Sequence, residues 1–590
     1  MGNVEAASHI RSPSSPSLNP IASRTSSWSR AEKKWNRAQV GHQGSYSVER
    51  LELLARYCDN TSVLRVILVC LLTPLPSLTV AIGLECLPLR PPSEGWASNW
   101  MFWIRLTLMV FTMNIPGASQ ANLFVPGFNK TAATILTESV IVCALQVGTF
   151  LLEAVIFGFP VPFLWQIGAI SMGIYVSVVT RLVYGPAVFV KDSALGRQYK
   201  RFLDSFLVGL TLIGIYPLCR VLYDFIPPHN RWVVVLIIPL WKFAAKRFAV
   251  RMTRELEDFI PELVVFSVDF FSALFVSICM STAGSFSLTA LFIAVDIFFA
   301  IIKFREVHKN EKILLKLLNT RRRHATSGLR ARLAASNNSE LIPMLLEVVR
   351  APFAFHVSSL DRVRLWASPP HLIPEELYKR LQTLAASGIF SGCPSDVIRV
   401  SSGPAKRVMS WKFQQISVVP VPLGSNVRIT SKLRKGSSAR PNEPSKYLVI
   451  HGLQLLFHCE YLVLVEYIEC VVPLVFVAYK SILEQSPNVI YFPGGAGQWG
   501  MATVINLLLF AALEIGSLVL LHVFLRWKFR FSPLYQLAFV LETQFYAVQA
   551  HLFPVTIFLL QYQLAHMGTS FVIFRFWRIA LIIDAGASRS

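Results

Sequence analysis

The feature that most restricts the fold of this chain is a series of apolar runs, each roughly 20 residues long. A helix rises about 1.5 Å per residue, so about 20 apolar residues cross the roughly 30 Å hydrocarbon core of a bilayer. Eight runs precede a long polar segment and three follow it. They lie at about 63–84, 99–117, 132–157, 160–190, 202–223, 232–250, 260–280, 285–304, 459–481, 501–525 and 533–564.

The composition indicates that lipid, not water, surrounds these runs. The chain is 53% hydrophobic and only 15% charged, whereas about a quarter of the residues in an ordinary soluble domain are charged. Backbone groups exposed to lipid must satisfy their hydrogen bonds within the segment, which favours helices. We therefore predict an all-α, polytopic helical membrane protein with about 11 transmembrane helices, in a range of about 9–12, and one large cytoplasmic loop.

The polar segment between the two groups of runs, residues 305–446, sets the expected orientation. It holds 24 Lys and Arg against nine Asp and Glu, and so carries +15 of the formal net charge of +22. Because cytoplasmic loops are enriched in Lys and Arg, this segment and the N-terminus are predicted to lie on the cytoplasmic side. The sequence does not indicate which cellular membrane holds the protein.

The expected domain organisation follows from the position of the runs. The N-terminal tail is rich in Ser and Pro and has too few large aliphatic residues to fold. Within the polar segment, 340–349 and 374–385 have the pattern of short helices, and 415–430 alternates as strands do. The predicted parts are a disordered cytoplasmic tail at 1–45, an N-terminal membrane region of about eight helices at 46–304, a basic cytoplasmic loop or small module at 305–446, a C-terminal membrane region of about three helices at 447–566 and a C-terminal tail at 567–590.

A few polar side chains interrupt the apolar runs, and each one costs about 2.5–3.5 kcal/mol if it stays charged at mid-bilayer. Glu466 and Glu469 are three residues apart, so they share a helical face and would repel each other when both are ionised. Lys242 lies near the end of its run, where its ammonium is expected to extend to the lipid headgroups. The candidate intramembrane polar site comprises Glu466, Glu469, Glu514, Glu542, Gln549, Asp269 and Asp296.

These side chains allow two interpretations. They could form hydrogen-bonded seams between helices, or they could line a conduit through the membrane. The second interpretation predicts ion or solute transport that uses the acids of the C-terminal helices. The alternative function is a membrane scaffold or sensor that recruits partners or anionic lipid through the 305–446 loop.

A basic stretch at the start of the loop predicts contact with the bilayer surface. Leucines at 314–318 lead into Arg321, Arg322 and Arg323, the pattern of a basic amphipathic helix on a membrane face. Anionic lipid is therefore the expected partner of these three arginines.

Several other classes of function have no support in the sequence. No nucleophile, base and orienting group recur at a usable spacing, so we expect no enzymatic activity. No cofactor is expected, because the glycines near 494–497 lack the Gly-Lys-Ser/Thr ending of a phosphate loop. His458, Cys459 and Glu460 are neighbours in sequence and cannot converge on one metal ion from a helix. Basic residues beside apolar runs, without aromatics interleaved in a polar groove, do not indicate nucleic-acid binding.

Two stretches of the last third resemble a known family. They are EYLVLVEYIECVVPLVFVAY at Glu460–Tyr479, followed by Pro487-Asn488, and RFSPLYQLAFVLETQ at Arg530–Gln544; YSVERLELLARYCDNTSVLRV at Tyr46–Val66 adds to the likeness. The chain resembles a family of polytopic membrane proteins abundant in plant-pathogenic oomycetes. The resemblance implies a multi-pass architecture and carries no biochemical role.

Overall fold

The structure is a computed structural model of the 590-residue chain. It describes residues 39–568 except 126–127, 129, 187–189, 191–192, 283–285, 325–339, 356, 369–372, 392–400, 403–443, 494 and 498. Most of the predicted tail at 1–45, the strands expected at 415–430 and nearly all of the tail at 567–590 lie outside the described residues.

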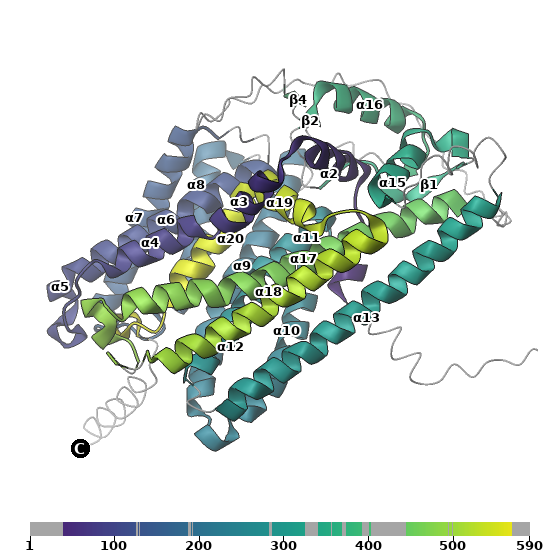
Figure 1. Ribbon diagram of the computed structural model, residues 1–590. Coiled ribbons are helices and arrows are strands. Elements are labelled where there is room, and N and C mark those ends of the chain that lie inside the picture. The colour runs from purple at the N-terminus through teal and green to yellow at the C-terminus, as the bar shows by residue number, and fades with distance from the viewer. Residues whose placement is uncertain are drawn as a thin grey trace, which may run out of the picture. The chain divides into compact units, whose positions relative to one another are not determined.

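The described chain is an all-α fold with four short strands (Figure 1). Its helices are α2 (Val48–Asn60), α3 (Val63–Leu72), α4 (Leu75–Glu85), α5 (Gly95–Ser98), α6 (Trp100–Phe124), α7 (Ala132–Phe157), α8 (Leu164–Tyr184), α9 (Ala194–Phe225), α10 (Trp232–Met252), α11 (Ile260–Val264), α12 (Phe270–Thr282), α13 (Phe286–His324), α15 (Leu341–Arg350), α16 (Glu375–Ala386), α17 (Pro444–Leu483), α18 (Met501–Phe529), α19 (Pro533–Thr543), α20 (Phe545–Phe553) and α21 (Leu559–Gln561). Two π-helical turns lie at Val265–Asp269 and Pro554–Phe558, and short 3-10 turns lie at Val40–His42, Pro92–Glu94, Pro228–Asn230, Glu257–Phe259, Pro352–Phe355, Pro487–Tyr491 and Ala565–Met567.

Polar caps fix where several helices begin. Ser47, Ser62, Thr131 and Ser193 stand at the N-caps of α2, α3, α7 and α9, and each side-chain oxygen accepts from a backbone N–H in the first turn. These bonds satisfy donors that a helix cannot satisfy itself. These four helices therefore begin directly after a Ser or Thr at the end of the preceding connection.

Each predicted apolar run falls on helical segments, and the runs at 63–84, 260–280 and 533–564 are each divided between two or more helices. Within the described chain, seven helices are long and apolar enough to cross a membrane: Val63–Glu85, Trp100–Phe124, Ala132–Phe157, Leu164–Tyr184, Glu257–Ser281, Ser445–Leu483 and Met501–Phe529. The pair Pro533–Thr543 and Phe545–Gln561, bent by 80°, makes an eighth if it is one span. The remaining predicted runs fall on α9, α10 and α13, so the prediction of about 11 spans stays open for these three helices.

Two of the long helices lie inside a bundle formed by the others. The most apolar window of Glu257–Ser281 is 94% buried and that of Ser445–Leu483 is 78% buried, whereas the other five range from 17% to 44%. Large apolar side chains on the outer helices point away from the protein, among them Ile170, Leu182 and Leu240. A soluble protein rarely exposes so much contiguous apolar surface. The chain thus has the helices and the apolar outer faces of a multi-pass membrane protein.

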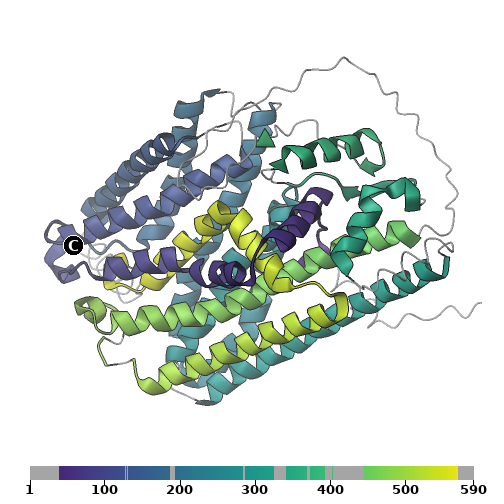
Figure 2. The same cartoon turned by 45° about the horizontal axis from the view of Figure 1, so that its top comes forward.

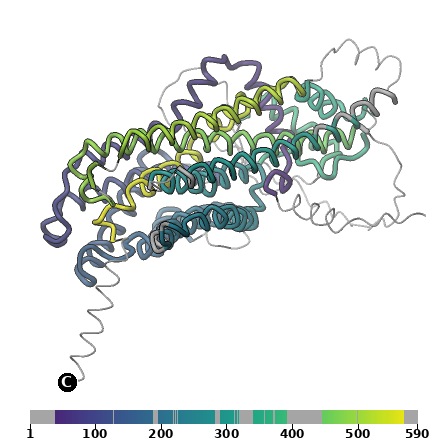
Figure 3. Tube along the Cα trace, turned by 60° about the horizontal axis from the view of Figure 1, so that its bottom comes forward, coloured from purple at the N-terminus to yellow at the C-terminus, as the bar shows by residue number. Residues whose placement is uncertain are grey.

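The 305–446 segment begins as helix and contributes a small module. Helix α13 continues past the apolar run to His324, and Figures 1 and 2 show it running alongside α18. The two predicted short helices are present as α15 and α16. Strand β1 (Leu360–Arg364) pairs in parallel with β3 (Phe390–Ser391), and β2 (Ile373–Pro374) pairs in parallel with β4 (Ser401–Ser402). In Figure 3 these elements gather at one end of the long helices; residues 341–391 are called the loop module below.

Candidate functional site

Five acids from four separate segments converge in the membrane region. Asp269 ends a π-helical turn, a feature often found at functional sites. Asp296 lies on α13, Glu466 and Glu469 lie one turn apart on α17, and Glu514 lies on α18. All except Asp296 are at most 6% exposed. We call Asp269, Asp296, Glu466, Glu469 and Glu514 the five-acid cluster.

Three lysines enter the cluster from α10 and α13. Lys242 Nζ lies 2.8 Å from Asp269 Oδ1 and 3.0 Å from Glu469 Oε1. Lys303 Nζ lies 3.0 Å from Glu466 Oε1 and 2.9 Å from Glu469 Oε2. The two lysines therefore clamp Glu469 from both sides and link three helices through one carboxylate.

The third lysine joins the π-helical turn to a tyrosine. Lys246 Nζ lies 2.7 Å from Asp269 Oδ1 and donates to the Tyr461 hydroxyl at 2.6 Å. Lys246 lies one helical turn beyond Lys242, so the two ammonium groups share one face of α10 and one acid. The lysine side chains are 16–26% exposed, so this side of the cluster is its more open side.

The other side of the cluster is a group of three carboxyls. Asp296, Glu469 and Glu514 each offer an oxygen, and these three oxygens lie within 4.8 Å of one another. The side chains of Asp296 and Glu514 are within hydrogen-bonding reach of each other, an arrangement that is favourable only when the two carboxyls share a proton or a cation. One oxygen of Glu514, Oε1, is buried without a hydrogen-bond partner among the described residues. This corner has the hard oxygen ligands that bind protons and small cations.

The charges of the cluster do not balance. Five carboxylates against three ammonium groups leave two negative charges when all eight groups are ionised. An uncompensated charge in the bilayer core costs about 2.5–3.5 kcal/mol on insertion scales. Two protons, one divalent cation, or one monovalent cation with one proton would neutralise the cluster.

Two of the predicted candidate residues do not join the cluster. Glu542 accepts a hydrogen bond from the Tyr57 hydroxyl at 2.8 Å and pairs with Arg65. Gln549 Nε2 donates to the carbonyl oxygen of Thr73 at 2.9 Å, at the break between α3 and α4. Both contacts bind α19 and α20 to the N-terminal helices, which fits the seam interpretation for these two residues.

The structure corrects the expectation for Lys242, which does not extend to the headgroups. It lies in the cluster because Asp269 and Glu469 supply two counter-charges within 3.0 Å. The mutual repulsion expected of Glu466 and Glu469 is likewise offset, since both contact Lys303.

The sequence contained a signal for these lysines. Lys242 and Lys246 are four residues apart, and Lys303 is seven residues after Asp296, so each pair shares a helical face.

A second charged group lies where α2 meets α11 and α17. The guanidinium of Arg50 is fully buried; it lies 2.7 Å from Glu262, lies 2.8 Å from Glu460 and donates to the carbonyl oxygen of Asp258 at 2.9 Å. Burial alone would lower the pKa of Arg50, but the two carboxylates outweigh it and raise that pKa well above its usual value. Burial also raises the pKa of Tyr46, whose hydroxyl donates to Glu460. Arg50 therefore stays charged and ties α2 to two helices.

The loop module is held to the same region by arginines. Arg364 donates to both oxygens of Asp258, at 2.7 and 3.0 Å, and lies 2.9 Å from Glu257. Arg350 donates to both oxygens of Glu52 on α2, at 2.7 and 2.5 Å. Bidentate arginine–carboxylate pairs of this kind fix orientation as well as contact. The module is thus docked on α2 and on the first turn of Glu257–Ser281.

The predicted lipid-binding arginines lie at the end of a long helix. Arg321, Arg322 and Arg323 occupy the last turn of α13, which ends at His324. Their backbone is helical, as the amphipathic pattern predicted, and their side chains lie outside the described part of the chain.

Comparisons with known proteins add no relative. No family model matches the chain, no curated protein matches it, and no solved structure matches it. The resemblance to the oomycete membrane proteins stays a prediction, and the argument for function rests on the geometry of the five-acid cluster.

Proposed function

We propose that this protein moves protons or small cations across a membrane through the five-acid cluster. The observation that carries the proposal is the surplus of negative charge in the cluster. Five acids meet three lysines among apolar helices, so two negative charges remain to be neutralised when all eight groups are ionised. A purely structural seam has no need of a surplus, because paired or neutral groups pack at lower cost. A site that takes up and releases cations requires such a surplus.

Glu514 is the proposed exchangeable ligand. It lies at the three-carboxyl corner, it has a buried oxygen without a partner, and no lysine nitrogen pairs with it among the described residues. Lys303 and Lys242 then have a different role from Glu514: they hold Glu469 in place, so that its position does not depend on whether a cation is bound. The lysines also keep the total charge low enough for a bound cation to leave again.

The test is a flux measurement on full-length protein in proteoliposomes, with proton, Na⁺, K⁺, Mg²⁺ and Ca²⁺ gradients applied in turn. We expect wild-type protein to dissipate at least one gradient, and Glu514→Gln to reduce that flux by about tenfold or more while the protein stays folded. Glu542→Gln is the matched control, because it makes the same change at an acid that pairs with Arg65 outside the cluster. Well-folded wild-type protein that dissipates none of these gradients would refute the proposal.

The docked loop module favours a second candidate function, that of a membrane scaffold or sensor. Arg350 and Arg364 join the module to α2 and to the start of a central helix, so a partner or lipid bound at the module could act on the membrane helices. The lipid-sensing form of this role uses Arg321, Arg322 and Arg323, which lie outside the module at the end of α13. Replacing these three arginines by glutamine should lower the affinity of the protein for anionic vesicles, by about 1 kcal/mol per charge at low salt. Equal binding of wild-type and substituted protein to anionic and neutral vesicles would exclude the lipid-sensing form of this role.

A further inference from the structure

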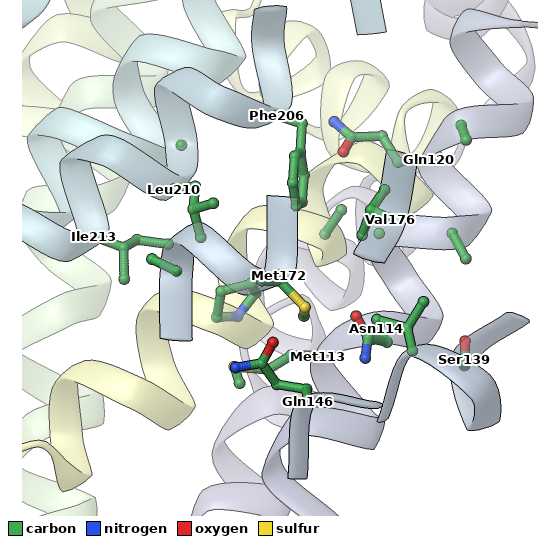
Figure 4. A pocket seen from close by; sticks show the side chains of 18 of the residues that line it. Met113, Asn114, Gln120, Ser139, Gln146, Met172, Val176, Phe206, Leu210 and Ile213 are labelled. Atoms are coloured by element: carbon green, nitrogen blue, oxygen red, sulfur yellow. The ribbon is translucent and has the colours of Figure 1, made fainter. Parts of the chain in front are cut away.

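A cavity of about 150 Å³ lies between α6, α7, α8, α9 and α20, and its lining shares no residue with the five-acid cluster. Figure 4 shows it from close by: Leu210 and Ile213 lie on one side, and Asn114 and Ser139 lie on the opposite side. Gly209 lines it and is buried, yet a Cβ placed on this glycine would meet no atom within 4 Å. The cavity therefore leaves room for a small molecule inside the packed helices.

Polar side chains are distributed around the whole lining, and two of them are held by the protein itself. Gln146 Nε2 donates to the carbonyl oxygen of Gly168 at 3.1 Å, and Gln146 Oε1 accepts from Ser171 at 3.0 Å. His551 Nδ1 donates to the carbonyl oxygen of Ala547 at 2.8 Å, which leaves Nε2 of the neutral imidazole as an acceptor. The lining is thus polar at fixed points and not only at one end.

Four other polar side chains of the lining have unused hydrogen-bonding capacity. Asn114 and Gln120 on α6, Ser139 on α7 and Ser205 on α9 form no side-chain hydrogen bond with any described residue. Gln120, Ser139 and Ser205 are at most 4% exposed, and buried polar groups usually find a partner. Because these groups come from three helices, a ligand that satisfies them has hydrogen-bonding groups on more than one edge.

The charged groups of the lining are already paired. Lys130 Nζ lies 2.5 Å from Glu138 Oε2, and both side chains are at most 7% exposed. Each therefore has its counter-charge, and an ionised ligand would enter without one. A charge buried without a counter-charge is costly, so the ligand that fits is neutral.

The volume and the apolar part of the lining restrict the body of the ligand. An apolar cavity of about 150 Å³ elsewhere holds a single benzene ring. Met172, Val176 and Phe206 lie between the polar groups (Figure 4), and thioether and aromatic side chains make favourable contacts with planar rings. The cavity therefore suits one six-membered ring with apolar faces and polar edges.

We propose that this cavity binds a neutral single-ring heterocycle with amide-like edges, of the pyrimidine nucleobase class. A side-chain amide offers a donor and an acceptor side by side and pairs with the edge of a base, which is the role of Asn114 and Gln120. The ring faces lie against Met172 and Phe206. The site is independent of the five-acid cluster, so absence of cation flux would leave this proposal intact.

The test measures saturable binding of tritiated uracil to full-length protein in detergent. Wild-type protein is expected to bind one molecule. Gly209→Leu projects a side chain into the cavity, so it should weaken binding by about tenfold or more. Gly148→Leu is the matched control, because Gly148 is an exposed glycine in α7 whose Cβ also meets no atom within 4 Å; it should bind like wild type.

A second variant keeps the test decisive if Gly209→Leu fails to fold. Asn114→Leu removes an amide that forms no side-chain hydrogen bond within the described chain. Thermal unfolding should therefore stay close to that of wild type. Uracil binding should weaken by about fivefold or more, because one bidentate pair with the ring edge is lost.

Competition by unlabelled compounds tests the chemistry of the ligand. Unlabelled uracil should displace the label. Orotate, which is the same ring with an anionic carboxylate, should compete at least about tenfold more weakly, because the lining has no unpaired positive charge. Toluene, a ring without polar edges, should also compete at least about tenfold more weakly. Equal competition by orotate or toluene, undiminished binding by folded Gly209→Leu or Asn114→Leu, or no saturable binding by wild type would each overturn the proposal.

Discussion

The lysines of the five-acid cluster give its acids two different roles. Glu469 contacts both Lys242 and Lys303 and serves as their shared counter-ion. Glu514 has the same side chain and a similar burial, but it faces other carboxyls and no lysine. Removing the charge of Glu469 therefore takes one of two acid contacts from each of Lys242 and Lys303, whereas removing that of Glu514 relieves repulsion. The same substitution should have opposite consequences at the two positions.

We predict that Glu469→Gln destabilises the protein by up to about 3 kcal/mol, the lower part of the range for breaking a buried ion pair, because both lysines are partly exposed. Glu514→Gln should change the free energy of unfolding by less than about 0.5 kcal/mol or increase it. Thermal unfolding of the two variants in one detergent measures the difference. Equal destabilisation by both would show that Glu514 is a structural partner and not an exchangeable ligand.

At the scale of elements, the apolar runs were sufficient to place the helical segments and insufficient to place their breaks or their partners. Three of the runs are divided between two or more helices, whereas Glu466 and Glu469 were predicted as a site from their spacing alone. Their meeting with Lys303 depends on which helices become neighbours, and no single run encodes that information. Likewise, nothing local to Arg50 shows that it would be buried between Glu262 and Glu460, since both partners are more than 200 residues away in sequence.

The docking of the loop module can be tested through one arginine. Arg364→Ala removes two charge-assisted hydrogen bonds to Asp258, each worth about 1.5–3 kcal/mol. We predict that amide exchange in residues 360–391 of the module becomes at least about tenfold faster. Lys379→Ala is the control, because Lys379 is exposed and pairs only with Glu375 in its own helix among the described residues. Unchanged exchange in Arg364→Ala would show that the Arg364–Asp258 pair does not hold the module in place.

At the scale of the whole chain, the distribution of charge predicts the orientation. The 305–446 segment carries +15, and positive loops stay on the cytoplasmic side. Protease added to sealed inside-out vesicles should cut this segment and leave the membrane helices intact, as gel analysis with an antibody to the loop would show. Asn129-Lys130-Thr131 and Asn337-Asn338-Ser339 are N-glycosylation sequons, which are used only on the luminal side. Protection of the segment, or glycans on Asn129 or Asn337, would reverse the predicted orientation.

We infer that the five-acid cluster exchanges charge with water and is not a dry seam between helices. Access to Glu514 tests it most directly, by reacting Glu514→Cys in sealed vesicles with a water-soluble, cationic methanethiosulfonate applied from each side in turn. Leu507→Cys is the control, because Leu507 lies seven residues earlier on the same face of α18 and is also buried. Peptide mass spectrometry separates modification at these positions from modification of the native cysteines. If water reaches the cluster, Glu514→Cys is modified from at least one side while Leu507→Cys is not; a Glu514→Cys thiol that is unreactive from both sides would show that the cluster is dry.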